Sequence, residues 1–198
     1  YCAFLYSKRK RIRWRKKKGA KRTIIPNRVA LSARPAGATN RTRYGHCEVD
    51  TIVGRKGTHG GVKTCYERKS RLVWARKVRN MRPVHHTEVE RIFTAQICCK
   101  SITRDNGIEN KYHEMLGVLS FFCDAYASGQ KGGVEHANKM IRRYFPKGTD
   151  FRSIRQSEID RVVSIINKKP RRILGYRSAL EVATKAGIIK NKSVLILG

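Results

Sequence analysis

Apolar and polar residues alternate from Gly45 to Val53, the period-two pattern that is typical of a half-buried strand. Two more strand patterns follow at 62–67 and 72–78. The joins between them are short and are rich in glycine or polar residues, as turns are. The pattern therefore predicts that the ordered part of the chain begins with an antiparallel meander of three strands.

The period changes at Pro83, after which apolar residues recur every three or four positions as far as Ile97. This spacing is typical of an amphipathic helix, and proline is well suited to its first turn. The remaining predicted elements are a strand at 98–104, a short helix at 109–116, a strand at 118–123, a helix within 129–145 and helices at 157–168 and 178–186.

This order of elements, β-β-β-α-β-α-β-α-α, predicts an α/β fold with a mixed five-stranded sheet flanked by helices. If the fourth strand lies parallel beside the first, the helix between them makes a right-handed crossover. We expect a basic arm and linker over residues 1–44, one core domain over 45–187 and a C-terminal tail over 188–198.

Charge narrows the choice of partner. The chain has 45 Lys and Arg against 14 Asp and Glu, a net charge of +31. Such self-repulsion indicates a polyanionic partner, and DNA is the first expectation, because phosphate contacts release counterions. An anionic membrane is the alternative, but no long basic amphipathic helix supports it and no apolar stretch is long enough to span a bilayer. The six cysteines lack a disulfide-framework spacing, which favours a reducing, cytoplasmic and nucleoid-associated setting.

The densest positive charge lies in the run from Ser7 to Arg22, which has almost nothing to bury. We expect it to be an extended arm that meets phosphate, with an indole ring able to stack on a base. A nuclear-localisation signal has the same composition, so that alternative stays open. The arm residues expected to contact DNA are Lys8, Arg9, Lys10, Arg11, Arg13, Trp14 and Arg15.

Three of the few acids are conspicuous by their positions. Asp50 lies in the middle of the first strand, Asp105 ends the fourth strand at an Asp-Asn-Gly turn, and Glu135 lies in the first turn of a helix. If they converge, they repel one another unless cations lie between them, and hard oxygen ligands favour two Mg²⁺ or Mn²⁺ ions. Taken singly, each acid is better explained as a structural ion pair or a turn residue, but together, on this topology and at this charge, they favour a catalytic role.

Other side chains are expected to support these acids. Lys139 and Arg142 share the helix of Glu135 and, with Arg143, are predicted to hold DNA phosphates. The predicted supporting residues around the carboxylates are His46, Glu48 and Asn106.

Two alternative sites are weaker. His85-His86 and Cys98-Cys99 suggest zinc, but adjacent ligands do not easily close one tetrahedron. Cys47 lies beside His46, but neighbours in a strand point to opposite faces, which disfavours a thiol nucleophile.

A set of segments, in order along the chain, also carries a family likeness. They are Ile25–Val29, Arg34–Ala36, Gly45–Asp50, Glu67–Arg71, Asp105–Gly107, Gln130–Gly132, Val134-Glu135, Arg143–Phe151 and Leu174–Tyr176. With them the chain resembles, from about Ile25 to Gly187, the catalytic core of bacterial DDE transposases of the insertion-sequence-thirty type.

That resemblance implies a retroviral-integrase-like, ribonuclease-H-like fold, with Asp50, Asp105 and Glu135 as a catalytic, metal-binding triad. It implies cleavage of transposon ends by water, followed by joining of a DNA 3′-hydroxyl to target DNA. We also expect a homo-oligomer when the protein acts on DNA.

The chain departs from the family pattern at several positions. Cys47 and Gly129 stand where tryptophan is usual, Ala125 where proline is usual and Asn110 where an aromatic residue is usual. The segment from Asp105 to Glu135 is shorter than usual by about four residues, roughly one helical turn. The upstream helix-turn-helix region is absent, so we expect a fragment. The alternatives are a decayed transposase or other basic protein that binds nucleic acid without cutting it, and a plain nuclease of the same fold.

Overall fold

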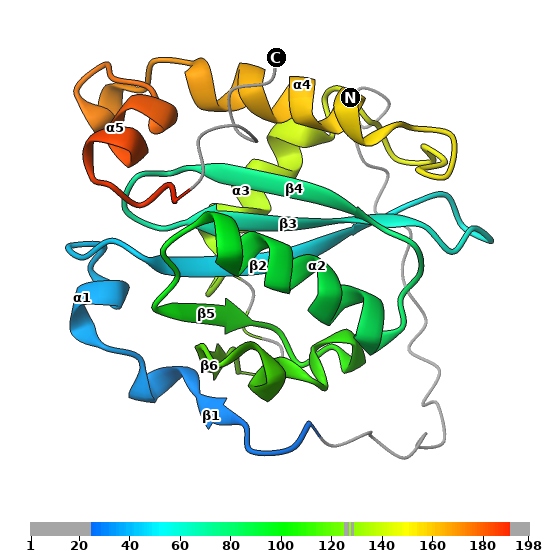
Figure 1. Cartoon of the computed structure of the whole chain (residues 1–198), viewed down its shortest axis with the longest axis horizontal. Coiled ribbons are helices and arrows are strands. Elements are labelled where there is room, and N and C mark those ends of the chain that lie inside the picture. The colour runs from blue at the N-terminus through cyan, green and yellow to red at the C-terminus, as the bar shows by residue number, and fades with distance from the viewer. Residues whose placement is uncertain (1–24, 125–126, 128, 191–198) are drawn as a thin grey trace, which may run out of the picture.

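The structure is a computed structural model that describes residues 25–124, 127 and 129–190. Its centre is a mixed sheet with the strand order β1-β6-β5-β2-β3-β4 (Figure 1). The strands are β1 (Val29–Ala30), β2 (His46–Val53), β3 (Gly61–Glu67), β4 (Val73–Val78), β5 (Ser101–Arg104) and β6 (Leu119–Phe122). Strands β2, β3 and β4 form the predicted antiparallel meander, while β5 runs parallel to both β2 and β6.

The expected number of strands was wrong by one, because the described sheet has six. The additional strand, β1, consists of two residues that pair in parallel with Phe121 and Phe122 of β6. It comes from the segment that was predicted to be only arm and linker. Two residues cannot display an alternation, and the prolines on either side favour a linker, so the sequence pattern had no signal for this strand.

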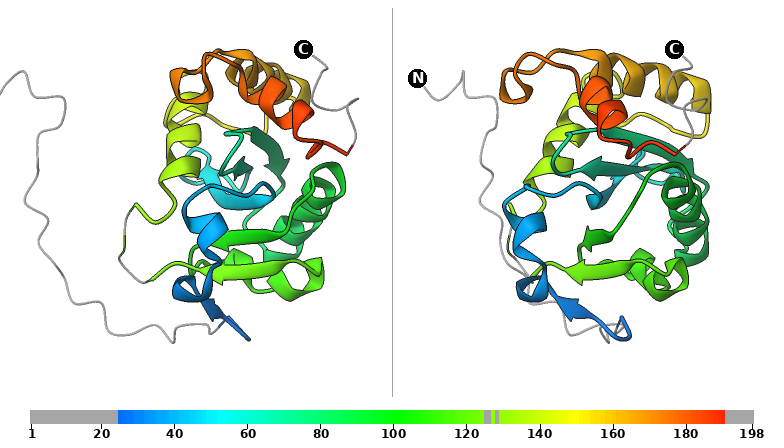
Figure 2. Two further views of the ribbon diagram at one scale, coloured as in Figure 1. Left: turned by 90° about the vertical axis from the view of Figure 1, so that its left-hand side faces the viewer. Right: turned by 60° about the vertical axis from the view of Figure 1, so that its left-hand side comes forward.

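Helices cover both faces of the sheet (Figure 2). The described helices are α1 (Ala36–Thr39), α2 (Pro83–Gln96), α3 (Gly132–Ile141), α4 (Gln156–Lys168) and α5 (Ala179–Lys185), with short 3-10 turns η2 (Leu31–Ala33), η3 (Ile108–Asn110), η4 (His113–Leu116) and η5 (Arg172–Leu174). No helix among the described residues is long and apolar enough to cross a membrane.

The alternation along β2 sends its residues to two different cores. Cys47 and Val49 are buried in the core beneath α2, whereas Ile52 is buried in the core that includes α3 and α4. Since successive strand residues point to opposite faces, Asp50 shares the face of Ile52 and is directed toward α3. The strand therefore brings a carboxylate to the side of the sheet on which the helix of Glu135 lies.

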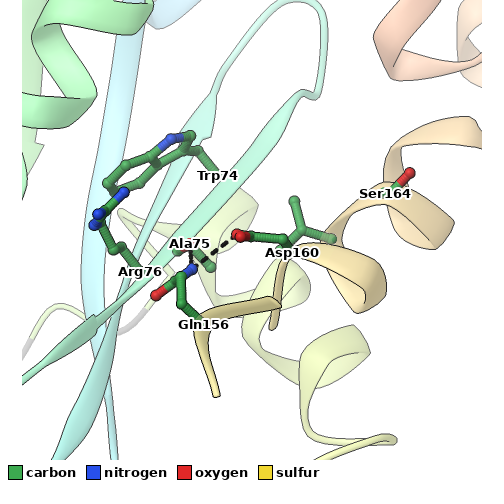
Figure 3. Close-up of a pocket in the computed structure, with 7 residues that line it drawn as sticks. Trp74, Ala75, Arg76, Gln156, Asp160 and Ser164 are labelled. Atoms are coloured by element: carbon green, nitrogen blue, oxygen red, sulfur yellow. Dashed lines mark hydrogen bonds between the residues drawn. The ribbon is translucent and has the colours of Figure 1, made fainter. Parts of the chain in front are cut away.

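Helix α4 lies along β4, the strand at one edge of the sheet, and satisfies part of its free backbone. Near its start, the Gln156 side chain donates to the carbonyl of Ala75 at 3.2 Å (Figure 3). It also accepts from the N–H of Lys77 at 2.9 Å. Near its end, the Asn167 side chain both donates to the carbonyl of Val73, at 2.7 Å, and accepts from its N–H, at 2.9 Å. Two side-chain amides thus take the place of a neighbouring strand.

The expected C-terminal tail begins inside the fold. Ile188 is buried in the α2-side core, and its carbonyl accepts a hydrogen bond from the N–H of Cys98 at 2.8 Å. Residues 191–198 lie outside the described part of the chain, as do residues 1–24 of the expected basic arm.

Candidate active site

Two of the three predicted acids meet at a single ammonium group. Asp50 lies on β2 and Asp105 directly follows β5, the parallel neighbour of β2. The Nζ of Lys131 donates to Asp50 Oδ1 and Asp105 Oδ2, each at 3.1 Å, and to the carbonyl of Val49 at 3.3 Å. The two carboxylates, far apart in sequence, are therefore directed at the same point in space.

Neutral amides hold the other oxygen of each carboxylate. The side-chain Nδ2 of Asn138, on α3, donates to Asp50 Oδ2 at 2.7 Å, and Thr64 donates to the Oδ1 of Asn138 at 2.8 Å. The side-chain Nδ2 of Asn110 donates to Asp105 Oδ1 at 2.9 Å. Each carboxylate thus presents one oxygen to a positive charge while a neutral donor orients the other.

The third predicted acid, Glu135, lies in sequence between Lys131, which precedes α3, and Asn138 of α3, both of which contact Asp50. Lys131, Glu135 and Asn138 are spaced at i, i+4 and i+7, so they follow one face of the helix. Because Lys131 and Asn138 both contact Asp50, the face that carries Glu135 is the one turned toward β2. In this conformation no three His, Cys, Asp or Glu residues in the described part of the chain form a group that could hold a metal ion.

The electrostatics of the site follow from burial and from Lys131. Burial alone raises the pKa of Asp105, but the ammonium of Lys131 outweighs it and the net pKa is lowered. Burial alone lowers the pKa of Lys131, and Asp50 and Asp105 outweigh it in turn, so its pKa is raised. Lys131 and Asp105 are therefore both charged near neutral pH.

The predicted supporting residues have distinct positions. Glu48 is fully buried, pairs with Arg68, and accepts the backbone N–H of Val134 at 2.9 Å, which anchors the first turn of α3. His46 instead makes a 2.7 Å hydrogen bond with Ser101.

The hydrogen bonds of the Asn106 side chain are directed away from the carboxylates of Asp50 and Asp105. It donates to the carbonyl of Cys123 at 2.8 Å and accepts from Arg28 at 2.7 Å. It therefore joins the end of β5 to the end of β6 and to the segment before β1.

The packing of the start of α3 against the sheet can be tested at Gly133, which lies against the buried ring of Tyr66. A Cβ at this position would lie 2.3 Å from Cε1 of Tyr66 and 2.8 Å from Oε2 of Glu48, and both of those residues are buried. Alanine favours a helix over glycine by about 1 kcal/mol, but such crowding costs about 1–3 kcal/mol. We expect Gly133→Ala to lower the free energy of unfolding, as measured by urea denaturation.

The adjacent Gly132→Ala is a matched control, because nothing lies within 4 Å of a Cβ built there. This variant should be neutral or slightly stabilising. Equal stability of the two variants would show that the start of α3 is not held against Tyr66.

A fully buried ionic network lies beneath Asp105. Glu90 of α2 pairs with Lys63 of β3 at 2.9 Å and with Arg104 of β5 at 2.5 Å. Both cations also donate to Asn110 Oδ1 at 3.4 Å, which leaves the Nδ2 of Asn110 directed at Asp105. Burial by itself raises the pKa of Glu90, but Arg104 and Lys63 lower it to about 2.

The predicted DNA-contacting residues of the core lie on or just after α3. Lys139 and Arg143 are exposed, whereas Arg142 is half-buried and donates to the carbonyl of Val53 at 2.6 Å. Arg142 therefore also ties α3 to the end of β2. The predicted arm contacts, Lys8 to Arg15, lie outside the described residues.

The predicted zinc alternative gains no support from the fold. His85 and His86 lie in the first turn of α2, whereas Cys98 and Cys99 follow its last residue. A helix of this length separates its ends by about 20 Å. His86 is buried, and burial together with Lys63 lowers its pKa to about 4, so it is a neutral core residue.

Sequence reasoning missed the residues that organise the carboxylates. Lys131 lies within the Gln130–Gly132 segment of the family likeness, but it was given no role because lysine is common throughout this chain. The Lys63–Glu90–Arg104 network was missed because charged residues are expected to be exposed. The available signals were the lysine within the second strand pattern and Asn110, which stands where the resemblance expects an aromatic residue.

No family model matches the chain. It is 35% identical over 165 residues to the transposase of insertion sequence element IS4351 from Bacteroides fragilis, which covers 80% of this chain and 50% of that protein. It is 32% identical over 177 residues to the transposase InsI of insertion sequence element IS30C from Escherichia coli, which covers 84% of this chain and 45% of that protein. The chain thus spans about half the length of the curated relatives it matches.

A solved structure has the same fold. The catalytic core domain of BIV integrase superposes with a TM-score of 0.57 at 15% identity, covering 72% of this chain and 95% of that one. The predicted mixed sheet with flanking helices is therefore confirmed as an integrase-like architecture. The sequence relatives and this fold together confirm the resemblance of the chain to insertion-sequence transposases, the insertion-sequence-thirty type among them.

Proposed function

We propose that this chain is the catalytic part of a DNA transposase that cleaves transposon ends and joins them to target DNA. The observation that carries the proposal is the approach of Asp50 and Asp105 to one cationic point on neighbouring parallel strands. Relatives named as transposases and the integrase-like fold support this assignment. The net charge of +31 suits a polyanionic substrate.

The donor set fits divalent cations of the Mg²⁺ or Mn²⁺ class. Asp50 and Asp105 already present oxygens to a shared positive charge, and carboxylate oxygens are the ligands that these hard ions prefer. In this proposal Asp50 and Asp105 hold two ions and Glu135 completes the second. When bound, such ions activate an attacking oxygen and stabilise a leaving one.

The chemistry is two successive displacements at phosphorus. In the first, a water oxygen bonds to the phosphorus and the bond to the 3′ oxygen breaks, which leaves a 3′-hydroxyl. In the second, that hydroxyl displaces a 3′ oxygen in target DNA. The residues of the chain position these reactants. The carboxylates define where the reacting phosphate binds. The flanking DNA backbone is bound by Lys139, Arg142, Arg143 and the basic arm.

The decisive experiment incubates this chain with a labelled duplex that carries the terminal sequence flanking its own reading frame, together with a target plasmid and Mg²⁺ or Mn²⁺. We expect nicking at the duplex end and then covalent joining of its 3′-hydroxyl to plasmid, both abolished by EDTA. Hydrolysis without joining would instead identify a nuclease. DNA binding without either reaction would identify a non-catalytic binding protein, and each of these results contradicts the proposal.

A further inference from the structure

Lys131 has the surroundings of a bound cation rather than those of a surface lysine. It is the residue before the first turn of α3, and its side chain is only 10% exposed. An ammonium has three donors, and here three oxygens receive them: Asp50 Oδ1, Asp105 Oδ2 and the carbonyl of Val49. The charge is thereby placed where two carboxylates would otherwise repel each other.

Each carboxylate is also contacted by a second side chain that is independent of Lys131. Asp50 keeps the 2.7 Å hydrogen bond from Asn138, and Asp105 keeps the one from Asn110, both on the oxygen that Lys131 does not touch. If the ammonium left, each carboxylate would still have one oxygen bonded to a neutral amide, and its other oxygen could accept a new cation. These are the conditions for exchanging one cation for another.

The backbone on either side of Lys131 is loosely packed. A Cβ built at Gly129 or at Gly132 would have no neighbour within 4 Å. The flexible four-carbon stem of lysine can swing its ammonium away without moving the helix.

We propose that Lys131 is a tethered counter-ion that holds Asp50 and Asp105 together in the metal-free protein and is displaced when a divalent cation binds between them. This rests on the proposed function and deepens it, because the lysine then sets how much metal the site requires. Lys131 competes with the metal because both need the same two carboxylate oxygens, and two cations at this spacing repel.

The first test measures Mn²⁺ binding by isothermal titration calorimetry in the absence of DNA. Lys131→Met should bind Mn²⁺ about 10-fold more tightly than the wild-type chain. Without metal, this variant should also melt at a lower temperature than the wild type. Mn²⁺ should raise the melting temperature of the variant by more than that of the wild type. Lys185→Met removes the same charge from an exposed position on α5 and should leave Mn²⁺ affinity unchanged.

Asp105→Asn separates failure of this inference from failure of the proposed function. If wild-type binding of Mn²⁺ requires Asp105 but Lys131→Met binds equally or more weakly, the counter-ion role is wrong. If no variant binds Mn²⁺, or if Asp105→Asn binds as the wild type does, the metal site itself is wrong and the inference falls with it.

A second test uses the unaltered chain, so it does not depend on whether a variant folds. A brief pulse of acetic anhydride, read by mass spectrometry, should label Lys131 several-fold more at saturating Mn²⁺ than in EDTA. Lys63, buried against Glu90, should stay protected in both, and exposed Lys185 should be labelled in both. Unchanged labelling of Lys131 under saturating Mn²⁺ would overturn the proposal.

Discussion

Replacing Asp105 by asparagine is expected to lower metal-dependent cleavage of DNA by at least about 1000-fold, or about 4 kcal/mol in the barrier. The amide keeps the shape of the carboxylate, but it removes the negative charge that attracts a cation at the shared point. Binding of DNA at a fixed salt concentration should change little, because the substitution removes no basic residue. The measurement is initial nicking rate under saturating Mg²⁺, with fluorescence anisotropy for binding.

A matched control is Asp160→Asn on α4, which removes the same charge from a side chain that contacts Gln156 beside β4. That variant should cleave at the wild-type rate. Nicking by Asp105→Asn at a rate comparable to the control would refute the assignment of the site, whatever the likeness to transposases.

The second large effect is expected at Glu90, whose change to glutamine should lower the free energy of unfolding by about 3–5 kcal/mol. Glutamine fills the same space, but Lys63 and Arg104 would be left as buried cations without a counter-charge. A loss of this size is a large share of the total stability of a domain. Urea denaturation at pH 7 measures it.

The loss of stability in Glu90→Gln should depend on pH. The folded-state pKa of Glu90, about 2, lies below its ordinary value of 4.5. Its stabilising contribution is therefore present above pH 4.5 and is lost as the pH falls toward 2, so the difference between wild type and Glu90→Gln should shrink over that interval. Exposed Glu88→Gln, on the same helix, is the control. If Glu90→Gln and the control had the same urea midpoint at pH 7, the negative charge of Glu90 would not stabilise the buried cations.

The strands of the fold could be predicted because their patterns are strong. The alternation through β2 was enough to place Asp50 on a face opposite Cys47, whereas the pairing of β5 with β2 was only one arrangement that the order of elements allowed. Short segments were a different matter, because helix 109–116 proved to be two 3-10 turns, η3 and η4, and β1 was missed. Elements of two to four residues gain their stability from packing and not from a local period.

The sequence singled out the two acids that share a contact with Lys131, but it did not single out the lysine between them. A carboxylate in the middle of a strand conflicts with propensity, and that conflict is visible in the sequence. The bridge made by Lys131 depends on where α3 begins relative to two strands, which is a tertiary property. The same holds for Asn110, whose amide is oriented by Lys63 and Arg104 from two different strands.

The amides of Gln156 and Asn167 have a consequence for how copies of this protein could associate. They occupy backbone groups of β4 that a strand from another subunit would need, and the opposite margin of the sheet, β1, offers only two residues. Intermolecular strand addition is therefore blocked on one side and poorly supported on the other. If copies of this chain associate, we therefore expect contacts between helices and loops rather than a sheet that continues from one copy to the next.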